Sequence, residues 1–239
     1  LHLHEKRIRL NKKISYYSYG RYGSSTTIEL ENILKELEQA YHVFLTGTGF
    51  GGVALAIMSV CRPGDEILVS DNVYGPTKEI SEKLLKEFNV IARFYDPDSF
   101  DDLKSKVSKK TKMILVENPG SNTFEFQDLS KIVNLAKRKK IFTFLDNTWG
   151  TPLYLKPLKL GFDMSFSSAT KYFSGHSDAM GGSLAVNKKV FKQIMFFYKL
   201  SGYRMSADEA YLIIRGLRTL DTRLNQHYEN TKQVINFLK

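Results

Sequence analysis

The protein has 239 residues, of which 42% are hydrophobic and 25% are charged, a composition typical of a folded globular chain and not of a disordered one. Its single cysteine, Cys61, excludes an intramolecular disulfide and a cysteine-based zinc site, and the histidines lack the HExxH spacing of a metalloprotease, so we expect no metal centre. The net charge is +10, but lysine and arginine are spread along the whole chain, which favours a solvated surface over a nucleic-acid interface.

Apolar residues occur in short runs. The longest unbroken run is Val53 to Met58, whereas a membrane-spanning helix needs about 20 apolar residues. The first residues of the chain are too polar for a secretory signal. We therefore expect a cytoplasmic protein whose partner is neither a membrane nor a nucleic acid.

Hydrophobic periodicity predicts helices that alternate with strands. Helices are predicted at residues 26–41, 51–60, 77–88, 100–107 and 129–140, and from about residue 188 onward. Strands are predicted at residues 42–46, 66–70, 90–95, 113–117, 141–146, 164–168 and 183–186. The spacings of Thr26 with Glu29 and of Ser206 with Glu209 are those of capping boxes at helix N-termini. The alternation predicts right-handed βαβ units and hence a three-layer α/β fold (αβα) with a mostly parallel sheet.

The last predicted helix, from about residue 219, has an apolar end. Val234, Ile235, Phe237 and Leu238 lie in its final turns, and no glycine, proline or turn cluster follows them. An apolar stripe on a helix needs a surface to pack against. We therefore expect residues 219–239 to lead into a C-terminal domain that this sequence does not contain.

Candidate binding groups follow the first two predicted strands, at the edge where a parallel sheet collects its functional groups. Gly47 to Gly52 (GTGFGG) leads into a helix, and such a turn presents backbone N–H groups to a phosphate or, in the plainer interpretation, is only a tight turn. Tyr74 follows the second strand and is a candidate for stacking on a planar ligand, or else a packed loop aromatic.

Charged and hydroxyl side chains follow the fifth and sixth predicted strands. Asp146 ends the fifth, where a buried carboxylate is costly without a cationic partner. Lys171 follows the sixth, and a lysine in a crowded, partly dry site can act as a nucleophilic amine. The hydroxyls of Ser168 and Thr170 beside it suit phosphate oxygens. A phosphate cradle, a stacking ring, an acid and an amine are together what pyridoxal 5'-phosphate (PLP) requires.

The chain resembles the Cys/Met-metabolism family of PLP-dependent enzymes, which includes cystathionine γ-synthase, cystathionine β- and γ-lyases and methionine γ-lyase. The matching segments are Tyr19-Gly20-Arg21, Thr48-Gly49-Phe50, Pro63-Gly64-Asp65, Tyr74-Gly75-Pro76-Thr77, Glu117-Asn118-Pro119, Asp146-Asn147-Thr148-Trp149, Ser168-Ala169-Thr170-Lys171-Tyr172, Gly175-His176-Ser177-Asp178 and Arg215 to Leu220. The resemblance implies the aspartate aminotransferase-like fold of PLP-dependent transferases (fold type I), with residues 26–218 as the PLP-binding large domain.

The resemblance also implies roles for individual residues. Lys171 is implied to be the Schiff-base lysine and proton shuttle, Asp146 to pair with the pyridine nitrogen, and Tyr74 to stack on the ring. The implied phosphate ligands are the backbone N–H groups of Gly49 and Phe50 and the hydroxyls of Ser168 and Thr170.

The N-terminal residues 1–25 are implied to be an arm that contacts a neighbouring subunit. Arg21 would bind that subunit's phosphate, and Tyr19 would lie near its substrate. This arrangement requires a homodimer or homotetramer, whereas in a monomer Arg21 would be a surface arginine. Ser25 departs from the family pattern, because many relatives carry a proline at that position.

Three segments are most similar to bacterial cystathionine β-lyase: residues 117–121 (ENPGS), 146–149 (DNTW) and 175–180 (GHSDAM). The implied reaction is β-elimination of cystathionine, a thioether amino acid, to homocysteine, pyruvate and ammonia. One alternative is the γ-chemistry of cystathionine γ-synthase, cystathionine γ-lyase or methionine γ-lyase on the same fold. Another is a chain without catalysis, either an inactive truncated remnant or a basic binding module.

Overall fold

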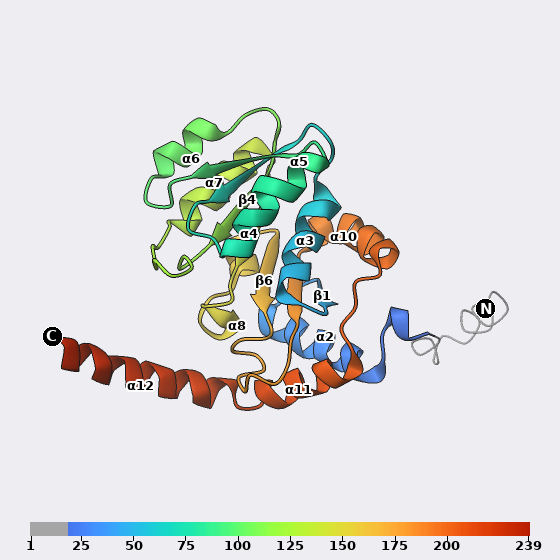
Figure 1. Ribbon diagram of the computed structural model, residues 1–239, viewed down its shortest axis with the longest axis vertical. Coiled ribbons are helices and arrows are strands. Elements are labelled where there is room, and N and C mark those ends of the chain that lie inside the picture. Colours follow the sequence, from blue (N-terminus) through green and yellow to red (C-terminus); the bar gives the residue numbers. More distant parts are fainter. Residues whose placement is uncertain (1–18) are drawn as a thin grey trace.

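The alternating pattern forms a seven-stranded sheet between two layers of helices (Figure 1). A computed structural model describes residues 19–239 of the chain. The strands are β1 (His42–Thr46), β2 (Glu66–Ser70), β3 (Ile91–Tyr95), β4 (Thr111–Glu117), β5 (Phe142–Asp146), β6 (Met164–Ser168) and β7 (Gly182–Val186). Their order in the sheet is β1-β7-β6-β5-β4-β2-β3, and β7 runs antiparallel to both of its neighbours. The predicted α/β fold with a mostly parallel sheet is confirmed.

The helices cover both faces of this sheet. They are η1 (Gly20–Tyr22), α2 (Ser25–Glu38), α3 (Gly49–Val60), α4 (Gly75–Glu79), the π-helical turn η2 (Ile80–Leu84), α5 (Leu85–Glu87), α6 (Phe100–Lys106), α7 (Leu129–Lys139), α8 (Thr151–Tyr154), α9 (Pro157–Leu160), α10 (Lys188–Ser201), α11 (Ala207–Leu217) and α12 (Leu220–Leu238). Helices α3, α5 and α10 pack on one face, and α2, α6, α7 and α11 pack on the other.

Side chains of each inner strand alternate between these two faces. In β2, Ile67 and Val69 belong to the core beneath α3, α5 and α10, whereas Leu68 belongs to the core beneath α6 and α7. The same alternation in β4 places Met113 with the first core and Ile114 with the second. A strand that is apolar on both faces must be covered on both, which is why the helices form two layers.

The structure corrects one of the two predicted capping boxes and confirms the N-cap of the other. Helix α2 is capped by Ser24, whose Oγ accepts the N–H of Thr27 (3.2 Å) while Oγ1 of Thr27 accepts the N–H of Ser24 (2.8 Å), so the predicted box of Thr26 and Glu29 is wrong. Helix α11 has half of its predicted box: Ser206 caps the N–H of Glu209 (3.1 Å).

Other boundaries move for local reasons. The Glu209 carboxylate accepts the N–H of Met180 (2.7 Å) instead of completing the box on α11. Helix α2 ends at Glu38, and not near residue 41, because Gln39 adopts a left-handed conformation with φ 53°. The predicted helix at 77–88 is the run α4, η2 and α5, which begins two residues earlier because Pro76 suits a first helical turn.

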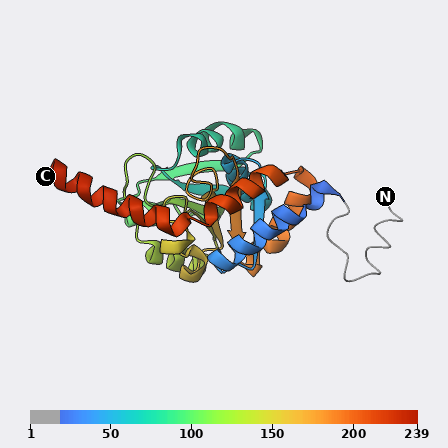
Figure 2. The same cartoon turned by 90° about the horizontal axis from the view of Figure 1, so that it is seen from below.

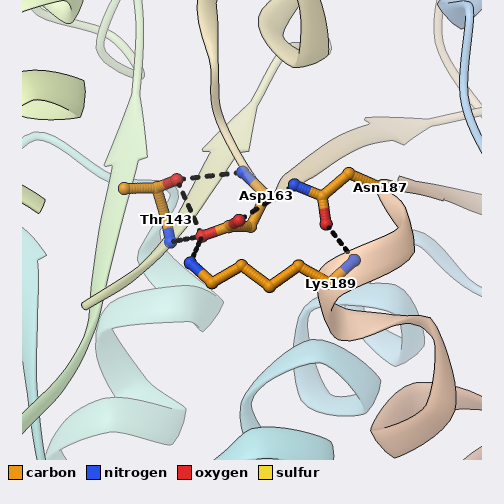
Figure 3. Close-up of polar contacts among 4 residues, drawn as sticks. All are labelled: Thr143, Asp163, Asn187 and Lys189. Carbon is orange, nitrogen blue, oxygen red and sulfur yellow. Dashed lines mark hydrogen bonds and ion pairs between the residues drawn. The ribbon is translucent and has the colours of Figure 1, made fainter. Parts of the chain in front are cut away.

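Asp163 lies at the amino-terminal edge of the parallel strands, is 4% exposed, and connects several elements there through hydrogen bonds (Figure 3). Its Oδ2 accepts the N–H of Thr143 (3.1 Å) and the ammonium of Lys189 (3.0 Å), and its Oδ1 accepts the amide of Asn187 (2.9 Å). These partners come from β5 and from the start of α10. Asp163, which directly precedes β6, therefore ties β5 and the start of α10 to β6 at the edge opposite the candidate site.

Helix α12 leaves the body of the molecule (Figures 1 and 2). Leu220 and Leu224 at its start are buried, whereas Phe237 and Leu238 at its end are 88% and 75% exposed. No helix within residues 19–239 is long and apolar enough to cross a membrane. The C-terminal domain, the N-terminal arm (of which residues 1–18 lie outside the described residues) and the cytoplasmic location stay predictions.

Candidate active site

The carboxyl ends of β1, β5 and β6 meet at one edge of the sheet. The N–H of Ser168, which ends β6, donates to Oγ1 of Thr148 just after β5 (2.9 Å). A Cβ atom placed on Gly49 would lie 2.6 Å from Oγ of Ser168, so the start of α3 packs directly against the end of β6. The glycine turn, Asp146 and Lys171, which lie far apart in the sequence, are thereby gathered at the same edge.

The start of α3 offers backbone donors. Oγ1 of Thr48 accepts the N–H of Gly51 (3.0 Å), whereas the N–H groups of Gly49 and Phe50 have no acceptor among residues 19–239. The hydroxyl of Ser168 also has no hydrogen-bond partner in that part of the chain. Two N–H groups and a hydroxyl at the N-terminus of a 12-residue helix are suited to an anion such as a phosphate.

The hydroxyl of Thr170 is already engaged. It donates to the carbonyl oxygen of Gly181 (3.3 Å) and accepts the N–H of the same residue (3.1 Å). A hydroxyl has one proton, so Thr170 could donate to a phosphate only by giving up the longer of these two bonds. Ser168 is therefore the better-placed of the two predicted hydroxyl donors.

Asp146 is a buried carboxyl group, 9% exposed, at the end of β5. Its Oδ1 accepts the N–H of Thr148 (2.9 Å), and no lysine or arginine of the described residues forms an ion pair with it. Burial raises the pKa of Asp146 to about 6. The structure thus confirms the expected buried acid and leaves its negative charge for a cationic ligand.

A second buried carboxyl group lies beside it. Glu117 at the end of β4 is the register partner of Asp146 and is 6% exposed. Burial, together with the neighbouring charge of Asp146, raises the pKa of Glu117 to about 8. Its Oε2 accepts the N–H of Tyr74 (2.7 Å), which fixes the backbone of Tyr74 at this edge, while the Tyr74 side chain is 52% exposed.

Lys171 lies in the turn after β6. Its N–H donates to the carbonyl of Ser168 (3.1 Å) and its carbonyl accepts the N–H of Gly175 (2.8 Å), so the backbone is fixed while the side chain is exposed. The crowded, partly dry environment expected for this lysine is therefore not formed by the described chain. Nearby, the ring of Trp149 contacts those of Phe124 (5.2 Å between centroids) and Tyr172 (6.2 Å), both edge to face.

Tyr19 and Arg21 lie outside this cluster. The Arg21 guanidinium donates to the carbonyl of Lys199 at the end of α10 (3.0 Å) and lies over the ring of Tyr22 (4.8 Å from its centroid). Within one chain the structure therefore does not bring Arg21 to the strand ends. Its predicted role in a neighbouring subunit stays a prediction, as does that of Tyr19.

Sequence reasoning assigned no role to Glu117 or to Thr148. Asp146 was singled out because it is a carboxylate at the end of an apolar strand. Glu117 has the same feature at the end of β4 and could have been identified in the same way. The role of Thr148 in holding Ser168 depends on the packing of β5 against β6, for which the sequence has no local signal.

Comparison with known proteins agrees with this geometry. The sequence profile of the Cys/Met metabolism PLP-dependent enzyme family matches residues 2–239. The chain belongs to this family. It is 36% identical over 223 residues to a protein named putative cystathionine beta-lyase from Rhizobium johnstonii, covering 93% of this chain and 56% of the relative. It is 35% identical, at 93% and 55% coverage, to an L-alanine/L-glutamate racemase from Wolbachia pipientis.

Solved structures show the same fold. A cystathionine gamma synthase from Xanthomonas oryzae, solved with aminoacrylate and cysteine, superposes with a TM-score of 0.89 at 32% identity, covering 92% of this chain and 57% of that one. The chain thus spans little more than half the length of the relatives it matches.

The residues present fit the family's cofactor, PLP. The buried carboxylate of Asp146, which forms no ion pair within residues 19–239, suits a protonated ring nitrogen, and the N–H groups of Gly49 and Phe50 suit the phosphate. Lys171 is an accessible amine at the same edge.

Proposed function

We propose that this chain is the cofactor-binding part of a PLP-dependent carbon–sulfur lyase that carries out β-elimination of cystathionine to homocysteine, pyruvate and ammonia. The observation that carries the proposal is the convergence, at one sheet edge, of a buried acid, two backbone N–H groups and an exposed lysine. Neither the acid nor the N–H groups have a cation or an acceptor among the described residues. Each matches a different part of PLP, and no nucleic-acid or structural role explains all three together.

In this proposal PLP, when bound, supplies a conjugated ring that takes up electrons from the substrate. The amine of Lys171 would hold the cofactor and, once the substrate's amine has displaced it, would accept the substrate's α-proton. The Asp146 carboxylate stabilises positive charge on the ring nitrogen, and Gly49, Phe50 and Ser168 bind the phosphate. Thr170 joins them if its hydroxyl turns away from Gly181.

The exposure of the site supports the proposed assembly. Tyr74 is half exposed and Lys171 is exposed, whereas proton transfer at carbon is favoured in a site that excludes water. A neighbouring subunit in a homodimer or homotetramer would cover this edge, with Arg21 binding the phosphate and Tyr19 lying near the substrate. A thioether amino acid is the proposed substrate.

The choice of β-elimination rests on the segments at 117–121, 146–149 and 175–180 and on the cystathionine beta-lyase relative. The structure named cystathionine gamma synthase matches 92% of this chain, and the sequence of the relative named racemase matches 93% of it. Similarity therefore does not separate the three reactions, and an analysis of the products is needed to decide among them. All of these reactions begin with removal of the α-proton, which is the step assigned to Lys171.

The experiment has two parts. The purified chain is saturated with PLP, reduced with borohydride and analysed by peptide mass spectrometry. We expect cofactor attached at Lys171, together with a visible absorption band that Lys171→Ala abolishes and that Lys86→Ala, a substitution of an exposed lysine on α5, leaves unchanged. An unmodified Lys171 would overturn the proposal.

The products formed from cystathionine then test the reaction. Pyruvate together with homocysteine supports β-elimination, whereas 2-oxobutyrate as the keto acid would replace it with γ-elimination. A racemised amino acid without any keto acid would assign the chain to racemisation.

A further inference from the structure

The turn that carries Lys171 packs against the start of helix α12. In Figure 1 the segment after β6 reaches the junction of α11 and α12. Ala169 and Phe173, which lie on either side of Lys171 in the sequence, are buried in the same core as Leu220 and Leu224 of α12. The Lys171 side chain between them is exposed. The place of this lysine therefore depends on contacts with α12.

Arg223 lies on the same face of α12 as these two leucines and binds the turn directly. Its Nη2 donates to the carbonyl of Tyr172 (2.8 Å) and to the carbonyl of Gly216 near the end of α11 (2.8 Å). Its Nε donates to Oγ1 of Thr219 (3.1 Å). One helical turn further on, the ring of His227 contacts the ring of Tyr172 edge to face (5.7 Å between centroids). The start of α12 thus holds the residue that follows Lys171 by both its backbone and its ring.

Only one of the two carbonyls depends on Arg223. The carbonyl of Gly216 also accepts the N–H (3.1 Å) and the hydroxyl (3.2 Å) of Thr219. The carbonyl of Tyr172 accepts from no other group within residues 19–239. Loss of the guanidinium would therefore release the Tyr172 carbonyl, whereas the end of α11 would stay capped.

The guanidinium also lies against the backbone at Gly175. A Cβ atom on Gly175, whose φ is 70°, would collide with the guanidinium of Arg223. The N–H of this glycine donates to the carbonyl of Lys171 (2.8 Å). Arg223 therefore supports the turn at two places, the Tyr172 carbonyl and the glycine that binds the Lys171 carbonyl.

Three consecutive peptide groups around Lys171 are held in this way. The Lys171 N–H donates to the carbonyl of Ser168 (3.1 Å), its carbonyl accepts from Gly175, and the next carbonyl, that of Tyr172, accepts from Arg223. Peptide groups are planar, so fixing three in succession restricts the backbone dihedral angles between them. The direction in which the Lys171 side chain leaves the backbone is fixed with them.

We propose that Arg223 is a positioning residue, which fixes the turn at 171–175 from α12 and so directs the Lys171 side chain toward the strand ends. The use of a fixed lysine rests on the proposed function, in which its amine must meet a cofactor held by Asp146 and Gly49. Placement matters there, because a shift of about 1 Å in a reacting group can cost roughly a hundredfold in rate.

Amide hydrogen exchange of the cofactor-free chain, resolved by NMR, tests whether Arg223 fixes the turn. In Arg223→Gln we expect the amides of Lys171 and Gly175 to exchange roughly tenfold faster or more, and those of residues 142–146 in β5 to keep their rates. The matched control is Arg218→Gln, which removes the same charge from an exposed arginine that makes no side-chain hydrogen bond within residues 19–239 and should change neither set.

Arg223→Lys provides a second variant. An ammonium lacks the planar fork of the guanidinium but can still reach one carbonyl, so we expect a smaller acceleration confined to the same turn. It is judged by the same criterion if Arg223→Gln does not fold. Unchanged exchange at Lys171 and Gly175 would overturn the inference, and so would an equal acceleration of the turn and of β5, which would mean that Arg223 supports the whole fold.

Trapping of PLP with borohydride then tests the consequence for the lysine. Arg223→Gln should raise the PLP concentration that gives half-maximal modification of Lys171 by roughly tenfold or more, as measured by peptide mass spectrometry. Arg218→Gln should leave this concentration within about twofold of the wild-type value, because it makes the same change of charge away from the turn. Equal values for the two variants would refute the positioning role. A wild-type chain that is never modified at Lys171 would instead refute the proposed function, while the exchange rates, measured without PLP, would still decide whether Arg223 fixes the turn.

Discussion

Glu38 offers a sharp test of how burial of an acid affects the stability of this fold. It ends α2, is 1% exposed, and its Oε2 accepts the hydroxyl of Ser165 on β6 (3.0 Å). The Lys156 ammonium nearby donates instead to the carbonyl of Leu37 (3.0 Å). Burial raises the pKa of Glu38 from an ordinary 4.5 to about 8, so the folded state binds the proton more tightly than the unfolded state.

The sign and size of the effect follow from linkage. Between about pH 4.5 and pH 8 the unfolded chain has released this proton and the folded chain has kept it, so the free energy of unfolding falls as pH rises. At pH 7 the gap is about 2.5 pH units, which at 1.36 kcal/mol per unit corresponds to a loss of roughly 3 kcal/mol relative to pH 4. Glutamine carries no proton equilibrium, so Glu38→Gln should remove this contribution.

The assay is urea unfolding at several pH values from 5 to 8. We expect Glu38→Gln to be more stable than wild type at pH 8 by roughly 4 kcal/mol and to match it to within about 1 kcal/mol near pH 5. Glu36→Gln, on the exposed face of the same helix, is the matched control and should parallel wild type at every pH. Equal pH dependence in Glu38→Gln and wild type would refute the assignment of a protonated Glu38.

Two further substitutions test the packing. Asp163→Ala leaves the N–H of Thr143 and the amide of Asn187 without an acceptor, so it should lower the free energy of unfolding in urea by about 2–4 kcal/mol. Asp98→Ala, at an exposed position, is the control and should change this free energy little. Comparable values for the two variants would contradict a stabilising role for the hydrogen bonds in Figure 3. Gly216→Ala places a Cβ atom against the backbone carbonyls of residues 173 and 174, so it should lower the free energy of unfolding by about 1–3 kcal/mol in thermal unfolding. The control is Gly20→Ala, whose Cβ atom meets nothing within 4 Å and should leave stability unchanged. A Gly216→Ala variant as stable as wild type would show that the backbone at this contact can relax.

Much of the fold was predictable because its signals are local. The strands at 42–46, 66–70 and 164–168 have the bounds expected from their apolar runs. Helix ends were less predictable, since they depend on single backbone conformations such as that of Gln39 or on a side chain recruited elsewhere, as Glu209 is by Met180. The place of β7 between β1 and β6, antiparallel to both, also has no local signal.

By itself the sequence determined which groups lie at the carboxyl ends of the parallel strands, the edge of the sheet that holds the candidate site. Strands that alternate with helices run parallel, so the residues after each strand, including Gly49, Asp146 and Lys171, must come out at the same edge. The tertiary structure alone decided how those groups meet. Strand order and register set Glu117 beside Asp146, and the packing of β6 against β7 engaged the hydroxyl of Thr170 with Gly181. Pairing between segments that are distant in the sequence depends on the whole fold, because a slip of one residue in strand register turns every side chain of a strand to the other face of the sheet.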